Sequence, residues 1–542
     1  MKTNYKINIR IPLAILTIGF FLMGCKKGSE DVVENLSGDA YLSIKVEGIK
    51  EVAGDPAIMS ATGRTDELKG NSKRTAVVKN NLLRKSFQGF DANIQLKNET
   101  LENKVVSSSK RSSSSSDIKA AALTNIPMAQ GTKYKILLYR AGGYVKTVSA
   151  IAGSLIKVEV EKNVEYNWYA YTYNTADDLP DVTNTANPVI ESLTDKALYY
   201  ASGTVMVTGE GVVNKPLNLE FDHRTSRVGV EISARGMFAG IQTIQATLAN
   251  NTYVKKGVLN LFTGQYESTN TVDVGPLTFS SISGATKDTI KVAYYYTAGQ
   301  EAITPFVVNV QSITLKLDKG DTRTFSSGFQ YSNNLSTMTW GNRMTSAIDL
   351  VESPLTVAGV EWARANLYFS SADKAYRFRH QISSSYGRVD EEYWNFKAPF
   401  PNGAIGAQDP CTRVYPLNTW RMPSRNETEA LINVTSGRTL DPDFVEYAAT
   451  GTGAPYPSNR LRINKMGYFN LVLGIFGVNE DGDNGYFWTS DTGIFGGLVT
   501  GVYCYRVSDN KENGIFGGDN VWLHTALSSW GGSENIRCVR NN

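Results

Sequence analysis

Hydrophobic and polar residues alternate with a period of two over many short stretches of this chain. The first such stretch, residues 40–47, alternates apolar positions with mostly polar ones: Ala40, Leu42, Ile44 and Val46 against Tyr41, Ser43, Lys45 and Glu47. Because successive side chains of a β-strand point to opposite faces, this period is typical of a half-buried strand. We therefore predict an isolated N-terminal strand here.

Two clusters of similar stretches follow, each divided by Gly, Asn and Asp turns. The first cluster comprises residues 134–139, 143–148, 155–160 and 164–173, and ends in a turn-rich segment, residues 177–188. The second cluster comprises residues 204–208, 217–221, 227–232, 258–262, 290–296 and 306–317. No helix of convincing length interrupts them. The pattern predicts two β-sandwiches, over residues 85–188 and 189–353.

The connection between the isolated strand and the first predicted sandwich is polar and contains Arg64, Arg74 and Arg84. Exposed polar loops are the preferred sites of proteolytic cleavage. A cut after one of these arginines would separate the strand from the body of the protein. We therefore interpret residues 25–84 as a tether, an N-terminal strand and a cleavable loop.

Composition agrees with a mainly β chain. Hydrophobic residues make up 41% of the 542, with 28 Tyr and 48 Gly, which suits pleated surfaces joined by tight turns. A chain of this length is too long to fold around a single hydrophobic core, so we predict three or four domains. Lys plus Arg total 55 against 52 Asp plus Glu, mixed along the chain, so the charge balance gives no case for nucleic-acid binding.

Residues 1–24 have the features of an export signal. Basic residues precede an apolar stretch, residues 11–22, which is too short to span a bilayer as a mature helix. The stretch ends in Leu-Met-Gly-Cys25, which resembles a lipobox, the site where bacteria attach diacylglycerol to a Cys thiol. That resemblance implies that Cys25 is the mature N-terminus and carries a membrane anchor. The alternative is an ordinary secretory signal with a coincidental cysteine.

Three further cysteines, Cys411, Cys504 and Cys538, lie in the last quarter of the chain. In an oxidising compartment one disulfide and one odd thiol is the simplest arrangement, and spacing alone does not rank the three pairings. The chain has no C-x-x-C pair and only 3 His. We therefore expect no zinc site, no His-based catalytic centre and no cofactor.

An acidic segment, residues 479–485, places Asp481 and Asp483 at alternate positions, as calcium loops do. The EF-hand pattern nevertheless fails, because its sixth-position Gly and twelfth-position Glu are missing. A solvated acidic turn is the better interpretation. Whether calcium binds near Asp481 and Asp483 stays open.

Short motifs that follow the lipobox in order carry a family resemblance. Residues 219–232, with the sequence LEFDHRTSRVGVEI, resemble the strand pair around a His that marks the second domain of fimbrillins, the subunits of type V pili. Residues 131–134 and 166–174 resemble first-domain strands. Across residues 38–350 the resemblance implies two tandem transthyretin-like β-sandwiches. It also implies an assembly route, in which a protease cuts after an Arg, the N-terminal strand leaves, and another subunit donates a strand.

The character of the chain changes after Pro354, since six of the 8 Trp and all three remaining cysteines lie beyond it. Cys411 is followed by Trp-Arg-Met-Pro at residues 420–423, Tyr-Phe-Trp at 486–488 and Ile-Arg-Cys at 536–538. This order resembles the C-type-lectin-like domain known as the major paralogous, or FISUMP, domain.

That second resemblance covers residues 355–542 and implies a disulfide between Cys411 and Cys538, which joins the two ends of the domain. Cys504 would then be a free, buried thiol. Independently of the resemblance, Ser424 and Glu427 have the spacing of a capping box and predict the start of a short helix. We expect the ligand contacts of this domain at tryptophan residues outside these motifs.

Candidate ligand contacts are Trp394, Trp522 and Trp530, which lie outside the framework motifs of this domain and can stack on sugars where they are exposed. The expected fold is mainly β, with two tandem transthyretin-like sandwiches followed by an α+β C-type-lectin-like domain. The expected divisions are a signal peptide, a tether with strand and loop, two sandwiches and the lectin-like domain: 1–24, 25–84, 85–188, 189–353 and 354–542.

These features together predict a non-enzymatic tip or accessory subunit of a pilus, anchored by lipid in the outer membrane and exposed at the cell surface. It would accept a strand from another pilin and bind a glycan or protein through the lectin-like domain. One alternative is a surface lipoprotein that binds such ligands without polymerising. A third, an enzyme like the formylglycine-generating enzymes, needs a reactive Cys pair that Cys504 alone does not provide.

Overall fold

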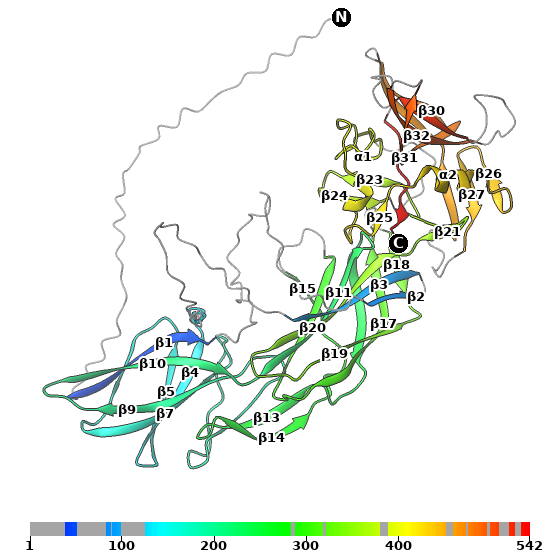
Figure 1. Ribbon diagram of the computed structural model, residues 1–542. Helices are drawn as coiled ribbons and strands as arrows, with labels where there is room; N and C mark the ends of the chain where they lie inside the picture. Colours follow the sequence, from blue (N-terminus) through cyan, green and yellow to red (C-terminus); the bar gives the residue numbers. More distant parts are fainter. Residues whose placement is uncertain are drawn as a thin grey trace, which may run out of the picture.

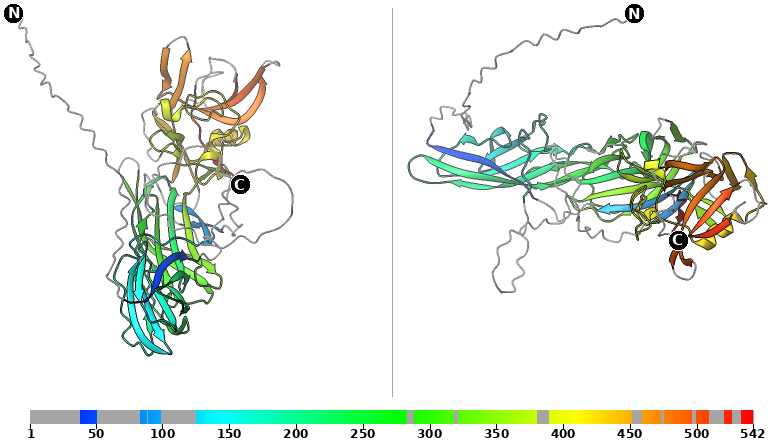
Figure 2. Two further views of the ribbon diagram at one scale, coloured as in Figure 1. Left: turned by 90° about the vertical axis from the view of Figure 1, so that its left-hand side faces the viewer. Right: turned by 90° about the horizontal axis from the view of Figure 1, so that it is seen from above.

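A computed structural model describes residues 38–50, 83–87, 89–98, 125–282, 288–317, 321–379, 389–450, 459–472, 475–495, 499–508, 520–525 and 533–541. The described chain is built almost entirely of β-strands, which confirms the prediction of a mainly β protein. Within it, no helix combines the length and apolar character needed to cross a membrane. Three groups of sheets follow one another along an elongated molecule, with β1 near one end and the C-terminal group at the other (Figures 1 and 2).

The first group is a seven-stranded sheet with the order β5-β4-β7-β9-β10-β1-β6. Its strands are β1 (Ala40–Ile49), β4 (Lys133–Arg140), β5 (Gly143–Ile151), β6 (Ile156–Glu159), β7 (Val164–Thr172), β9 (Tyr199–Val207) and β10 (Val213–His223). Alternate residues of these strands meet in one buried apolar cluster, to which β1 contributes Ala40, Leu42, Ile44 and Ile49. The N-terminal strand is therefore part of this core.

The second group packs a six-stranded sheet, β15-β16-β11-β20-β3-β2, against the sheet formed by β12, β17, β18 and β19. The strands of the first sheet are β2 (Leu83–Phe87), β3 (Phe90–Asn98), β11 (Ser226–Gly236), β15 (Ser280–Ser281), β16 (Ile290–Thr297) and β20 (Arg343–Glu352). Those of the second are β12 (Gly240–Leu248), β17 (Ile303–Lys316), β18 (Thr322–Phe325) and β19 (Phe329–Leu335). A small sheet adjoins both groups, with β8 (Val189–Glu191), β13 (Lys255–Asn260) and β14 (Gln265–Thr271).

The two groups interleave along the chain more than the predicted boundaries allow. Strands β2 and β3 pair in the second group, next to β20, although residues 85–98 were expected in the first sandwich. Strands β9 and β10 belong to the first sheet, although residues 199–223 were expected in the second. The alternation of side chains indicates that a strand is half buried, but the pairing partner is set by non-local packing. The remaining boundaries stay a prediction.

The C-terminal group consists of short strands and a few helical turns. A four-stranded sheet contains β21 (Leu355–Val357), β22 (Val360–Trp362), β34 (Val539–Arg540) and β25 (Trp420–Arg421). A hairpin contains β23 (Leu367–Ser370) and β24 (Ala375–Phe378), and a three-stranded sheet contains β26 (Arg438–Leu440), β27 (Phe444–Ala448) and β28 (Arg460–Asn464). A five-stranded sheet contains β29 (Met466–Val472), β30 (Ile475–Asp481), β31 (Asn484–Phe495), β32 (Val499–Ser508) and β33 (Asn520–Thr525).

The helical elements of this group are α1 (Val389–Glu392), the 3₁₀ helix η1 (Pro410–Arg413) and α2 (Arg425–Ile432). The capping box predicted for α2 is present: the Glu427 backbone N–H donates to the Ser424 hydroxyl, and the Ser424 backbone N–H donates to the Glu427 carboxylate. Leu431 is buried on the inner face of this helix. The local sequence therefore fixes where α2 begins, as expected for a capping residue.

Candidate functional site

Strand β1 lies in a furrow between two strands of the first sheet. It pairs in parallel with β10 from Ala40 opposite Val213 to Ile49 opposite Phe221. On its other side it pairs antiparallel with β6 over only four residues, from Tyr41 to Ile44. β1 thus has a neighbour along each edge, and Figure 1 shows it beside β10. Removing β1 would leave unpaired backbone N–H and C=O groups on both β10 and β6.

Apolar side chains of β1 fill the furrow. Leu42 and Ile44 are 0% exposed and belong to the apolar core of the first sheet. Burial of each such side chain stabilises a fold by about 1.5–3 kcal/mol relative to exposure. The furrow without β1 would therefore expose both apolar surface and open sheet edges. Such a surface is stable only when another strand enters it.

The C-terminal end of β1 is held by a close backbone approach. Ile49 and Ile126 exchange two backbone hydrogen bonds of 2.9 Å each. Gly48 has φ +139°, and a Cβ atom there would lie 2.4 Å from the Ile126 carbonyl oxygen. Only glycine fits this position without a shift. The register of β1 also shifts between Val46 and Gly48, so this end of the furrow has a defined shape.

The candidate cleavage residues differ in their surroundings. Arg64 and Arg74 lie outside the described residues, as does the candidate lipidation site Cys25. Arg84 lies in β2, where it is exposed and pairs in register with Asn93 of β3. The chain passes from β1 in the first sheet to β2 in the second group. A single cut between these strands therefore severs β1 from the rest of the folded body.

The last strand of the chain occupies the middle of a sheet. β34 pairs with β22 through Val539 and with β25 through Arg540. Just before it, Cys538 forms a disulfide with Cys411, the pairing that the family resemblance implies. The Cys538 carbonyl oxygen also accepts a 2.8 Å hydrogen bond from the Ala363 N–H. The described C-terminal strand is thus held on both edges and by a covalent bond.

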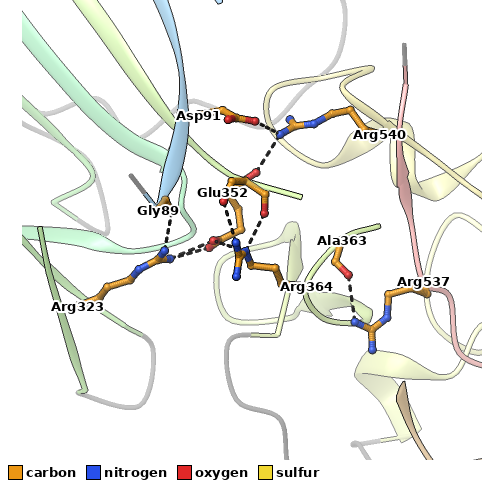
Figure 3. A network of polar contacts seen from close by, with 9 residues as sticks. Gly89, Asp91, Arg323, Glu352, Ala363, Arg364, Arg537 and Arg540 are labelled. Atoms are coloured by element: carbon orange, nitrogen blue, oxygen red, sulfur yellow. Dashed lines mark hydrogen bonds and ion pairs between the residues drawn. The ribbon is translucent and has the colours of Figure 1, made fainter. Parts of the chain in front are cut away.

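A buried network of charges joins the C-terminal group to the second group (Figure 3). Arg540 donates to Asp91 of β3 at 2.5 Å and to the Glu352 carbonyl oxygen at 3.1 Å. The Glu352 carboxylate accepts from Arg323 at 3.0 and 3.1 Å and lies 3.4 Å from Arg364. Burial lowers the pKa of both Arg364 and Arg540, while the neighbouring carboxylates oppose that shift. The Glu352 carboxylate is thus the shared partner of two buried guanidinium groups, those of Arg323 and Arg364.

Apolar and aromatic contacts accompany this network at the junction. Phe238, which follows β11 of the second group, lies in the core of the C-terminal group and contacts Phe378 edge to face at 5.4 Å. The Arg235 guanidinium lies over the Tyr415 ring at 4.2 Å. A side chain from one group that is buried in the core of the other fixes their relative orientation.

The free cysteine is buried, as expected. The Cys504 thiol donates a 2.7 Å hydrogen bond to a carboxyl oxygen of Glu534, and both residues are buried. Burial raises the pKa of Glu534 to about 8 and raises the pKa of the Cys504 thiol. Because the thiolate is the nucleophilic form of cysteine, this thiol is unreactive.

Of the three candidate ligand contacts, only Trp394 has a side chain that the structure describes. The expectation for Trp394 is wrong, since its ring is 0% exposed and lies in the core of the C-terminal group. Its indole N–H donates to the Leu367 carbonyl oxygen at 3.4 Å, and its carbonyl oxygen accepts from the Trp488 indole at 2.6 Å. Polar neighbours in sequence do not prevent an aromatic ring from turning inward. Trp522 lies in β33, its side chain outside the described set, and Trp530 is outside the described residues.

Residues 398–407 form an exposed apolar loop that was not predicted from the sequence and that contains no charged residue. Phe400 is 49% exposed and Ile405 is 52% exposed. The inner side of the Phe400 ring packs against Phe369, with ring centroids 5.1 Å apart, and against Tyr376 at 6.4 Å. The uncharged run Ala-Pro-Phe-Pro-Asn-Gly is the signal that could have identified it.

The acidic turn is formed from the end of β30 and the start of β31. Asp481 is the last residue of β30, and Asp483 lies in the turn that follows. Among the described residues, no three acidic, His or Cys side chains gather closely enough to hold a metal ion. Calcium binding near Asp481 and Asp483 stays a prediction without a test.

Comparison with known proteins gives one family match. Residues 160–361 match the model of the fimbrillin-like family. This segment includes parts of both sandwich groups, from β7 to β22. No curated protein matches the chain.

Solved structures similar to the chain come from Porphyromonas and Bacteroides species. The fimbrial anchor protein Mfa2 of Porphyromonas gingivalis is 12% identical, with 38% of this chain and 77% of that chain covered and a TM-score of 0.21. A candidate cell adhesion protein of Bacteroides fragilis is 12% identical, with 45% and 88% covered and a TM-score of 0.27. Another from Bacteroides eggerthii is 8% identical, with 59% and 98% covered and a TM-score of 0.26.

Proposed function

We propose that the protein is a fimbrillin-type surface subunit that accepts one strand from another pilin and ends the fibre at its outward tip. The observation that carries this proposal is the furrow occupied by β1, whose apolar side chains are buried while its neighbours, β10 and β6, need a strand between them. The match of residues 160–361 to the fimbrillin-like family supports the same assignment.

The acceptor role follows from the connectivity. A cut in the segment after β1 frees this strand, while β2 and β3 stay paired in the second group through β20. The furrow then takes an extended peptide by β-strand addition, in which main-chain hydrogen bonds give affinity and side-chain pockets give specificity. Arg64 and Arg74 are the preferred cleavage residues of this proposal, because Arg84 is already paired within a strand.

The terminal position follows from the other end of the chain. A stalk subunit must offer a spare strand to its neighbour, but β34 is paired on both edges and follows a disulfide-bonded cysteine. Donating it would require breaking a covalent bond, two strand pairings and the Arg540 contacts with Asp91. The protein therefore accepts a strand without giving one.

The adhesive surface of this proposal is the C-terminal group, which lies at the end of the molecule away from β1 (Figures 1 and 2). Its loop of residues 398–407 presents Phe400 and Ile405 to solvent. We assign ligand contact to this loop in place of Trp394, and the ligand is a surface glycan or protein. Cys25 carries the lipid that anchors the subunit at the cell surface before assembly. Catalysis is no part of this proposal.

The acceptor role is tested with a labelled peptide of residues 38–50 and purified full-length protein. We expect protein cut by an Arg-specific protease to incorporate the peptide, because its own strand can leave the furrow, and uncut protein to incorporate none. A matched peptide with Leu42→Lys and Ile44→Lys should fail, since a charged group would enter the apolar furrow. If cut protein retains its own strand and takes up no peptide, the acceptor role is wrong and the non-polymerising surface lipoprotein is supported.

A further inference from the structure

The second group contains a cavity of about 610 Å³ that is distinct from the β1 furrow and from the C-terminal group. It lies between the loop that joins β12 to β13, the loop that joins β16 to β17, and the end of β14. Met338, which is almost fully buried, lines its inner side. Its size falls within the range of about 300–1,000 Å³ that is typical of sites for small ligands.

An ion pair forms part of the cavity wall. The Lys255 ammonium lies 2.6 Å from the Glu301 carboxylate, with side-chain exposures of 24% and 64%. The hydrogen bond from Lys255 lowers the pKa of Glu301, so this side chain stays a carboxylate. Because the two charges neutralise each other, an ionic ligand gains little here. A neutral ligand with adjacent hydroxyl groups can instead donate to the carboxylate and accept from the ammonium.

The rest of the lining combines hydroxyl groups with an apolar inner surface. Thr252, Thr271 and Thr304 are exposed residues of the lining and offer groups that both donate and accept hydrogen bonds. Ile303 and Met338 supply apolar surface. A sugar ring has hydroxyl groups around its edge and C–H groups on its faces, so it matches both kinds of surface.

The loops around the cavity are fixed by hydrogen bonds. The Tyr253 hydroxyl donates to the Pro305 carbonyl oxygen at 2.8 Å and accepts from the Val307 N–H at 3.3 Å. The Thr297 hydroxyl accepts from the Lys255 and Gly299 backbone N–H groups at 3.0 and 3.1 Å. These contacts join the two lining loops, so the cavity is formed before a ligand arrives, which lowers the entropic cost of binding.

We infer that this cavity binds a neutral saccharide unit, which gives the protein a second ligand site in addition to the adhesive surface proposed for the C-terminal group. The inference depends on the lining alone and stands whether or not the protein joins a fibre. Glu301 and Lys255 orient the sugar hydroxyls, and the partly exposed Ile303 contacts the sugar's apolar face. A free sugar and the end residue of a cell-surface glycan share this chemistry.

Saturation-transfer NMR on the full-length protein tests the inference, with the methyl glycosides of galactose, mannose, fucose and N-acetylglucosamine as probes. We expect transfer to at least one probe and its loss in Thr271→Trp, which places a large ring at the cavity rim. Thr269→Trp, two residues earlier on the same exposed strand, is the matched control and should keep the signal. Glu301→Gln should weaken it severalfold, because it removes the charged acceptor.

Several outcomes would overturn the inference. One is the absence of transfer to all four probes by the parent protein. Another is a signal that Thr271→Trp retains. A signal lost in Phe400→Ala but kept in Thr271→Trp would place the sugar on the C-terminal group instead. Peptide uptake by the β1 furrow is measured separately, so failure here leaves the proposed pilus role unaffected.

Discussion

Leu42 and Ile44 are the large apolar side chains of β1 that are completely buried in the core of the first sheet. Lys45, between Ile44 and Val46, faces solvent instead. Leu42→Ala should therefore destabilise the first sheet by about 2–5 kcal/mol, through lost burial and the cavity left behind. Lys45→Ala on the same strand should change stability by less than about 0.5 kcal/mol. Chemical denaturation of both variants measures the difference, and equal effects would show that β1 is not part of this core.

Glu534 is the residue whose charge state most directly links pH to the stability of the C-terminal group. Its folded-state pKa is raised to about 8 by burial, above the ordinary value of 4.5. The folded state therefore binds the proton more tightly than the unfolded state. The stabilisation is fully present below the ordinary pKa and is lost as pH rises through about 8.

Glu534→Gln should accordingly reduce the loss of stability between about pH 5 and about pH 9, because the amide has no proton to lose. Burial also raises the pKa of Glu392 and Asp409, so the comparison is between variant and parent at each pH. Glu429→Gln, on the exposed side of α2, serves as the control and should leave the pH profile unchanged. A profile of Glu534→Gln that matches the parent would contradict the assignment.

At the scale of elements, the Glu352 carboxylate at the end of β20 joins Arg323 of β18 to Arg364 of the C-terminal group. Glu352→Ala leaves Arg323 and Arg364 buried without their shared partner, which should cost about 3–5 kcal/mol. Glu429→Ala, which breaks the exposed pair with Arg425, should cost at most about 1 kcal/mol. Thermal unfolding of both variants compares the two. A small effect of Glu352→Ala would mean that the C-terminal group is held mainly by Phe238 and other apolar contacts.

Individual strands and helices could be predicted from the sequence where neighbouring residues alone determine them. The alternation in residues 40–47 identified β1, and the Ser424 and Glu427 pair identified the start of α2. Neither required knowledge of the rest of the chain. The assignment of strands to sheets did require it: β3 and β9 have ordinary alternation, yet each pairs across the boundary drawn from sequence order. Strand partners depend on long-range packing that periodicity does not encode.

The candidate site was predictable only where a local pattern or a family resemblance identified its residues. The furrow strand and the Cys411–Cys538 disulfide followed from pattern and family resemblance. The burial of Trp394 could not be predicted, because its polar sequence neighbours gave no information on the direction of its ring. The second-group cavity was also invisible in the sequence. Lys255 and Thr271 are paired across the β13–β14 hairpin, but Glu301 comes from the distant connection between β16 and β17 and meets Lys255 only in the folded chain.

At the scale of the whole molecule, the two chain ends have opposite characters. β1 is joined to the body through a connection that carries Arg64 and Arg74, and a cut there interrupts none of the described strands. β34 is enclosed by two strands and follows a disulfide. The proposed terminal role depends on this asymmetry, because a subunit with these two ends would receive a neighbour on one side only.

The most direct test is to mix the protease-cut protein with a pilin that has a free donor strand, and to resolve the products by SDS gel electrophoresis without heating. We predict a single SDS-resistant complex of one donor and one acceptor, which does not grow when more cut protein is added. The triple variant Arg64→Ala, Arg74→Ala and Arg84→Ala, left uncut at these sites, should form none. Ladders formed by the cut protein alone would contradict the terminal role, because they would require β34 or another of its own strands to act as a donor.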